Sequence, residues 1–170
     1  NMERKPINPY GASKLAVEYM LKNISNLYGI KHFILRYFNA AGYDSQNRVT
    51  EPEQNPQNLL PIVMEVATGK RNKLEIFGND YNTADGTCVR DYIHVSDLAN
   101  IHIKAFELLI KEKRSEIINC GYGKGYSVKE VLDMANLICG NKIKIINGPR
   151  RTGDAQMLVS DISKLKQDNV

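Results

Sequence analysis

Tyr10 and Lys14 are the two side chains in this sequence whose types and spacing best suit chemistry. They lie four residues apart in the stretch INPYGASKLAVEYM, so a helix would place them one turn apart on one face. A phenol has a pKa near 10 and is a poor base at neutral pH, but an adjacent ammonium and the positive end of a helix stabilise the phenolate. Lowering that pKa to about 7 requires roughly 4 kcal/mol. Tyr10 is therefore a candidate proton-transfer residue, and Lys14 has further N–H donors for ribose hydroxyls.

The spacing alone leaves a second interpretation open. The chain has nine tyrosines and 15 lysines, so about one Y-x-x-x-K match is expected by chance. Tyr10 could equally be a tyrosine at the edge of the core, with Lys14 in solvent. The choice depends on the elements that position the pair and on the other motifs.

The elements nearest the pair are typical of a parallel α/β unit. Asn8 as N-cap and Pro9 at the first helical position predict a helix that Gly29 ends. Its apolar residues at helical spacing are Leu15, Tyr19, Ile24, Leu27 and Tyr28. The run KHFILRYFN at 31–39 then predicts a strand buried on both faces, and a helix feeding such a strand is half of a parallel crossover.

Helices and strands continue to alternate along the chain. Residues 43–58 predict a loop before a helix at 59–69, and two strand-like runs flank a turn-rich loop within 73–95. Residues 96–113 predict an amphipathic helix capped by Ser96. The remaining expected elements are a strand and glycine-rich turn at 116–127, a helix at 127–140 with a glycine stop, and a strand with period-two alternation at 142–148. This order predicts an α/β fold.

The glycine run CGYGKGYS is predicted to be an ordinary strand-to-helix turn. Its glycines stand at 121, 123 and 125, which does not fit G-x-G-x-x-G, and no crossover with an acidic residue follows. A complete dinucleotide-binding fold would open with a strand, a glycine-rich turn and a helix. This chain instead begins in polar sequence and stops at SKLKQDNV without a closing element, so both ends are expected to be truncated.

Composition predicts a soluble globular domain, or a piece of a larger one. The 170 residues are 42% apolar and 25% charged. No apolar run approaches the roughly 20 residues of a membrane helix, and no signal-peptide pattern is present, so we expect no membrane partner and a cytoplasmic location. The net charge of +4 is mild and interleaved, which argues against a nucleic-acid partner.

The cysteines and histidines predict neither a disulfide framework nor a metal site. Three cysteines without metal-site spacing fit a reducing compartment; they are Cys88, Cys120 and Cys139. The histidines share no ligand spacing and are interpreted as structural; they are His32, His94 and His102.

Six stretches together resemble the UDP-glucose 4-epimerases of the extended short-chain dehydrogenase/reductase superfamily. In order, they are NPYGASKLAVE, LRYFNAAG, NLLPIV, IFGNDYNTADGTCVRDYIHVSDLA, INCGYGKGYSVKEV and GPRRTGDAQMLVSD. PYGASK occurs across the superfamily, whereas the long block with its insertion between Asp80 and Arg90 resembles the epimerases in particular. The resemblance covers nearly the whole chain and aligns it with the part of those enzymes that follows the cofactor-binding half.

The resemblance implies the later part of a Rossmann-type parallel sheet plus a small α/β substrate-binding domain. Residues 1–40 would be the tail of the NAD-binding domain, and residues 41–170 mainly the UDP-sugar domain, with a possible return to the main sheet. The implied function is an isomerase of galactose metabolism, which inverts C4 of UDP-glucose and UDP-galactose through a 4-keto intermediate with bound NAD. The full-length protein would be a homodimer.

The resemblance also assigns roles near the cofactor. Tyr10 takes the proton-transfer position and Lys14 the ribose-binding position, while Phe38 lies beside NAD. Asn39 would hydrogen-bond the hexose or a phosphate; the alternative is a residue of a turn that ends the strand.

Further residues would bind the nucleotide. Asn58 and Leu59 would contact the diphosphate at a helix start, although Asn58 could be only an N-cap. The strand residues that would line the uracil are Glu75, Ile76 and Phe77. Phe77 would pack on the base, but a core phenylalanine would have the same sequence pattern.

Two arginines and an aspartate complete the implied substrate site. Arg90 and Arg151 would bind the diphosphate and Asp154 the ribose hydroxyls, while Arg150 is interpreted as structural. Leu158 stands where the family commonly has tyrosine or a smaller residue that gates bulk at the sugar 2-position. Leucine is intermediate in size, so acceptance of N-acetylhexosamines is left open.

Two alternatives to the epimerase remain. A sugar-nucleotide 4,6-dehydratase or decarboxylase would share PYGASK but lack the long insertion. A non-catalytic nucleotide-binding fragment is the other, because the family's catalytic serine or threonine and its glycine-rich cofactor contacts would lie upstream of Asn1.

Overall fold

The predicted α/β fold is confirmed in the computed structural model, which describes residues 4–49, 51, 53–140, 143–168 and 170. Lys142, at the start of the predicted strand 142–148, and Asn1 lie outside the described residues. The elements, in chain order, are α1 (Pro9–Tyr28), β1 (Phe33–Tyr37), β2 (Asn39–Ala41), α2 (Leu59–Ala67), β3 (Leu74–Phe77), β4 (Val89–His94), α3 (Val95–Glu112), β5 (Glu116–Cys120), β6 (Gly125–Ser127), α4 (Val128–Cys139), β7 (Ile145–Gly148), β8 (Met157–Leu158) and α5 (Ser163–Gln167).

Parallel pairs dominate the strand arrangement. β1 pairs with β5, β2 with β4, and β3 with β7, all in parallel. β4 also holds the short strands β6, in antiparallel orientation, and β8, in parallel orientation. Three separate segments of the chain, β2, β6 and β8, therefore pair with β4.

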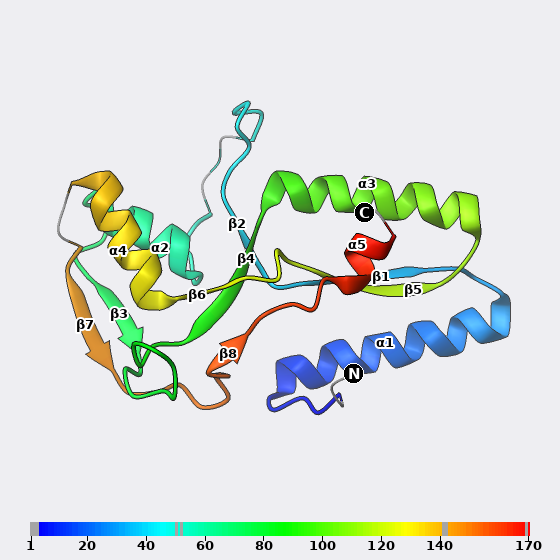
Figure 1. Ribbon diagram of the computed structural model, residues 1–170, viewed down its shortest axis with the longest axis horizontal. Helices are drawn as coiled ribbons and strands as arrows, with labels where there is room; N and C mark the ends of the chain where they lie inside the picture. Colours follow the sequence, from blue (N-terminus) through cyan, green and yellow to red (C-terminus); the bar gives the residue numbers. More distant parts are fainter. Residues whose placement is uncertain (1–3, 50, 52, 141–142, 169) are drawn as a thin grey trace.

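One half of the molecule is built around β1 and β5, with α1 and α3 on opposite sides of the pair (Figure 1). Its buried cluster comes from β4, α3 and β5: Ile93, Leu98, Ile101, Ile118 and Cys120. Phe33 and Leu35 of β1 pack against this cluster. The chain thus returns to its first strand after residue 115.

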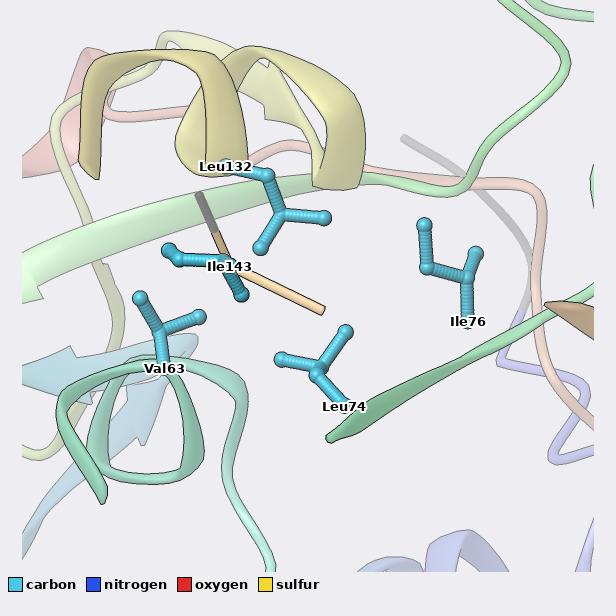
Figure 2. Packing of buried hydrophobic residues seen from close by; sticks show 5 residues of the cluster. All are labelled: Val63, Leu74, Ile76, Leu132 and Ile143. Atoms are coloured by element: carbon cyan, nitrogen blue, oxygen red, sulfur yellow. The ribbon is translucent and has the colours of Figure 1, made fainter. Parts of the chain in front are cut away.

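The other half consists of α2 and α4 packed beside each other and over β3 and β7 (Figure 1). Figure 2 shows its core, in which five aliphatic side chains from these elements and the chain before β7 converge: Val63, Leu74, Ile76, Leu132 and Ile143. This packing fixes β3 and the start of α2, which face the cavity described below.

Helix α1 begins and ends as the sequence predicts. The Asn8 side chain accepts a hydrogen bond from the Gly11 N–H at 2.8 Å, and Gly29 adopts φ 69° at the C-cap. However, none of its described side chains is buried. Its link to the strand layer is a two-point ion pair, in which the Arg36 guanidinium donates to Glu18 at 2.6 and 2.5 Å.

Two predicted strands are less buried than expected. β1 is only partly buried and its Tyr37 is exposed, because α3 covers one face while a cleft separates the other face from α1. β7 shows no alternation: Ile145 and Ile146 are both well exposed, since β7 pairs only with β3 among the described residues. The prediction of a strand buried on both faces is therefore wrong for this chain.

The ends of two helical elements also differ from prediction. The cap of α3 is His94, whose Nδ1 accepts from the Ser96 N–H at 3.2 Å, and Ser96 lies inside the helix. The chain passes directly from β4 into α3, which leaves no room for a separate cap at Ser96. Near the C-terminus, α5 forms where no closing element was expected.

The cysteines are free, with Cys88 and Cys120 buried and Cys139 partly buried. Among the helices that the structure describes, none combines the length and apolar character needed to cross a bilayer.

Candidate functional site

A cavity of about 170 Å³ lies where α2, β3 and β4 meet the segment before β8. Its lining includes most of the substrate-site residues predicted from the sequence: Asn39, Asn58, Leu59, Glu75, Ile76, Phe77, Arg90, Arg151 and Asp154. These residues come from five segments of the chain. The fold therefore gathers in one place side chains that are more than 100 residues apart.

Charge and aromatic surface are combined on one side of this cavity. The Arg151 guanidinium lies over the Phe77 ring, 4.5 Å from its centroid, and donates to the Asp154 carboxylate at 2.9 Å. The other oxygen of Asp154 is 3.9 Å from the Arg90 guanidinium. The Asp154 carboxylate thus contacts both arginines and brings their charges together, although Arg90 lies on β4 and Arg151 in the segment before β8. Two close guanidinium groups suit a diphosphate, and the aromatic ring suits a base.

β3 and α2 form the opposite wall. Ile76 lines the cavity but is 8% exposed and its side chain belongs to the core, whereas Glu75 is exposed and Phe77 partly buried. Asn58 occupies the N-cap position of α2, but its side chain makes no capping hydrogen bond. Pro61 has no N–H, and the Ile62 N–H donates to the Asn58 carbonyl at 3.2 Å. The first turn of α2 therefore offers the N–H groups of Leu59 and Leu60, which have no side-chain cap and suit an anion.

Asn39 and Leu158 both lie beside β4. The Asn39 side-chain nitrogen donates to the Asp91 carbonyl at 2.8 Å, which leaves its oxygen as the group that could meet a ligand. Leu158 is the register partner of Arg90 on β8 and is 46% exposed. Leu158 is absent from the residues that line the cavity, so the structure places it next to the site and not in its wall.

Arg150 anchors the segment that carries Arg151. Its guanidinium donates to the Asp80 carboxylate at 2.7 Å and lies 4.2 Å from the centroid of the Tyr81 ring. Asp80 and Tyr81 belong to the long insertion before β4. The insertion therefore holds the Arg151 segment from one side, which agrees with the structural role expected for Arg150.

The sequence analysis missed several residues of the cavity, of which Cys88 and Tyr92 are the most informative. With Arg90 they follow a period of two, so strand alternation could have found them. Burial raises the pKa of the Tyr92 hydroxyl, and the nearby Arg90 opposes that effect only in part. The hydroxyl therefore stays protonated at neutral pH and can donate to an anionic ligand.

Tyr10 and Lys14 lie in a second cleft, between α1 and β1. The Lys14 ammonium is 5.1 Å from the centroid of the Tyr10 ring, as expected for neighbours one turn apart, and Tyr10 is 72% exposed. Phe38 follows β1 directly and its N–H donates to the Cys120 carbonyl at 3.2 Å. Phe38 is not among the residues that line this cleft, whose last strand residue is Tyr37. The accessible phenol of Tyr10 and the ammonium of Lys14 suit the hydroxyls of a cofactor ribose.

A hydrogen bond joins the start of α1, which borders the second cleft, to the loop that borders the first cavity. The side-chain nitrogen of Asn8, the cap of α1, donates to the Gly153 carbonyl at 3.4 Å. Gly153 lies between Arg151 and Asp154 in sequence. The start of the Tyr10 helix therefore touches the loop that supplies the arginine and aspartate of the cavity.

The histidines have structural partners in two cases. His94 caps α3, and His102 accepts from the Tyr37 hydroxyl while its other ring nitrogen binds the Leu98 carbonyl at 2.7 Å. Nδ1 of His32 has no hydrogen-bond partner in the part of the chain that the structure describes. Across that same part, no group of three or more histidine, cysteine, aspartate or glutamate side chains could hold a metal ion.

The sequence profile of the NAD dependent epimerase/dehydratase family matches residues 1–121. The chain belongs to this family. This family is NAD dependent, and the matched residues include Tyr10 and Lys14.

Individual relatives agree with the family match. The chain is 47% identical over 159 residues to a UDP-glucose 4-epimerase from Halalkalibacterium halodurans, which covers 94% of this chain and 48% of the relative. The crystal structure of UDP-glucose-4-epimerase from Stenotrophomonas maltophila, with bound NAD and formylated UDP-arabinopyranose, matches with a TM-score of 0.88 at 38% identity, over 96% of this chain and 49% of that one. The UDP-Glc/GlcNAc 4-epimerase from Campylobacter jejuni matches with a TM-score of 0.72 at 44% identity, over 96% and 50%.

The resemblance to UDP-glucose 4-epimerases noted in the sequence is thereby confirmed. The chain spans about half the length of the curated relatives that it matches.

Proposed function

We propose that the full-length protein is a UDP-glucose 4-epimerase that interconverts UDP-glucose and UDP-galactose with bound NAD. The observation that carries the proposal is the convergence of Arg90, Arg151 and Phe77 near Asp154 in one cavity. A hydrogen bond from Asn8 to Gly153 joins the loop of this cavity to the helix that carries Tyr10. That arrangement offers a diphosphate site and a base-stacking surface beside a proton-transfer residue. The relatives named above support the same activity.

The cavity would hold the nucleotide and leave the sugar free to turn. Phe77 packs on the uracil, and Arg151 bridges the ring and the diphosphate while Arg90 neutralises its second charge. Asp154 accepts from ribose hydroxyls, and the first turn of α2 adds the backbone N–H donors of Leu59 and Leu60. A 4-keto sugar must present either face to the cofactor. The protein therefore has to bind the nucleotide tightly and leave the sugar free to rotate.

Proton transfer falls to the second cleft. Tyr10 removes the proton of the sugar 4-hydroxyl and later returns it, and Lys14 stabilises the phenolate and holds the ribose of the cofactor. NAD, when bound, supplies the hydride acceptor at C4. Phe38 flanks this position from the end of β1.

The experiment is a coupled assay in both directions with the full-length protein loaded with NAD. The expected result is exchange of UDP-glucose and UDP-galactose that Arg151→Ala reduces mainly through a higher KM. Exchange with neither nucleotide would refute the proposal, and release of a 4-keto-6-deoxy sugar would indicate a dehydratase. The N-acetylhexosamine nucleotides belong in the same assay, because Leu158 leaves that preference open.

The oligomeric state and the cellular location of the full-length protein are also matters of proposal. We infer a cytoplasmic homodimer for the full-length protein, in keeping with three free cysteines and an exposed apolar face on α1. Sedimentation of the full-length protein tests the dimer.

A further inference from the structure

Asp91 is a fully buried carboxylate that receives four hydrogen bonds. One oxygen accepts from the Tyr122 N–H at 2.9 Å, and the other accepts from the Gly123 N–H at 2.9 Å and from the Ser160 N–H at 3.1 Å. The Ser160 hydroxyl also donates to it. All four partners donate, which suits a carboxylate, since this group only accepts. Bonds of this kind are among the stronger hydrogen bonds in proteins.

The glycine run at 121–125 is shaped around this carboxylate. A Cβ atom on Gly121 would lie 2.6 Å from Asp91 Oδ2 and 2.4 Å from the Ser160 hydroxyl oxygen, so no side chain fits there. Gly123 adopts φ 71°, which favours glycine. Successive backbone N–H groups in such a turn form an anion site. The sequence predicts that this turn is not a nucleotide-binding loop. In the structure its N–H groups bind an anionic group of the protein itself, the Asp91 carboxylate.

The bond to Ser160 secures the segment that carries Arg151 and Asp154. This segment runs from β7 to Ser160 and pairs with β4 through the two exposed residues of β8 and a hydrogen bond from the Val89 N–H to the Gln156 carbonyl at 2.9 Å. Two strand residues give little pairing energy of their own. Asp91 binds the segment at Ser160, two residues after Leu158, and Arg150 anchors its other end by donating to Asp80.

We propose that Asp91 is a positioning residue for the substrate site. Through Ser160 and the glycine turn, it holds the segment 150–160 against β4, so that Arg151 and Asp154 face Arg90 across the cavity. Arg90 precedes Asp91 on the same strand and pairs with Leu158. The ligand class is a nucleoside diphosphate, and in this respect the inference rests on the proposed function.

The test compares Asp91→Asn with wild type in the full-length protein, by calorimetric titration with UDP and by steady-state kinetics. The amide must turn its NH2 group either toward the Tyr122 N–H or toward the donors of Gly123 and Ser160, so the glycine turn or the Ser160 anchor loosens. We expect UDP to bind about tenfold more weakly and KM to rise by a similar factor, with kcat changed by less than about threefold. In the part of the chain that the structure describes, the Asp91 carboxylate bonds to Tyr122, Gly123 and Ser160 and not to Tyr10 or Lys14, so we expect proton transfer to persist once substrate is bound.

A matched control separates positioning from general destabilisation. Glu130 accepts from the Ser127 N–H in the capping box of α4, away from the segment that Asp91 holds. Glu130→Gln is expected to lower the melting temperature without changing UDP affinity. Ser160→Ala removes one donor and keeps the backbone bond, and its UDP affinity is expected to fall about threefold.

The outcomes are distinguishable. Wild type that binds UDP while Asp91→Asn binds it equally well overturns the positioning role and leaves the proposed function intact. A lower kcat at unchanged KM also overturns it, because that result means only a smaller fraction of folded enzyme. Wild type that does not bind UDP overturns both proposals. If Asp91→Asn does not fold, Ser160→Ala decides, and unchanged affinity in that variant refutes the role.

Discussion

Asn8 contacts both Gly11 and Gly153, and so joins the start of α1 to the loop that carries Arg151 and Asp154. Its side-chain oxygen accepts from the Gly11 N–H at 2.8 Å, while its nitrogen donates to the Gly153 carbonyl at 3.4 Å. A serine in this position could cap the helix equally well but would be too short to reach Gly153. The amide therefore has a second use beyond capping.

Asn8→Ser is expected to keep the stability of α1 and to lower kcat/KM about two- to fivefold, since the loop with Arg151 and Asp154 loses its contact with the Tyr10 helix. Asn8→Ala, which loses the cap as well, should in addition cost about 1 kcal/mol of unfolding free energy. Thermal unfolding and steady-state kinetics of the two variants separate these effects. Wild-type kinetics in Asn8→Ser would show that the Gly153 contact has no catalytic consequence.

Tyr10→Phe is expected to abolish most turnover in the full-length protein and to leave UDP binding nearly unchanged. The hydroxyl is the group proposed to transfer the proton, whereas the groups proposed to hold the diphosphate are Arg90 and Arg151, in the other cleft. Single-turnover kinetics and UDP titration measure the two quantities separately. Activity equal to wild type would return Tyr10 to the edge-of-core interpretation.

The ion pair between Glu18 and Arg36 predicts a loss of stability in acid. Hydrogen bonds from Arg36 lower the pKa of Glu18, and burial opposes this in part. Because the folded-state pKa lies below the unfolded one, the pair stabilises the fold above about pH 4.3, and that stabilisation is lost as the pH falls through the folded value.

Glu18→Gln should therefore be less stable than wild type by about 1 kcal/mol at pH 7, and the gap should shrink toward pH 3. Urea unfolding across this range tests the sign. Asp133→Asn, on the exposed face of α4, serves as the control and is expected to show little effect. A gap that stays constant with pH would mean that the carboxylate charge is not the source of the stability.

The 170-residue chain on its own is expected to self-associate and to show no epimerase activity. α1 presents a large apolar surface on which Leu27 is 74% and Met20 56% exposed, and the cleft between α1 and β1 is open. Weak UDP binding should survive, because Arg90, Arg151 and Asp154 are all present.

Sedimentation and calorimetry test these expectations, and Leu27→Lys with Met20→Lys should reduce association without changing UDP affinity. A monomeric chain that bound NAD tightly and epimerised UDP-sugars would contradict this assignment of the cofactor site. In that case the glycine run at 121–125 would need to be reconsidered as its phosphate loop, in place of its role around Asp91.

Local sequence determined the elements whose formation depends on near neighbours. Asn8, Pro9 and Gly29 set the ends of α1, and a spacing of four residues was enough to place Lys14 over the ring of Tyr10. Ser127 and Glu130, three residues apart, likewise form the capping box of α4. In each case the interacting groups lie within one turn, so the helix geometry alone brings them together.

Only the tertiary structure decided the contacts that depend on strand pairing. Asp91 and Ser160 are 69 residues apart, and nothing in either local pattern shows that they meet. Register with β4 brings Leu158 beside Arg90 and allows Asp154 to hold two arginines. The two-residue strand β8 is too short to leave a periodic signal of its own.

The same reason explains the corrections. His94 replaces Ser96 as the cap of α3 because β4 runs directly into that helix, and β7 lacks alternation because only β3 lies beside it among the described residues. The burial of a strand is a property of its neighbours. The sequence of residues 31–39 shows which side chains could be buried, whereas the elements packed around β1 decide which of them are.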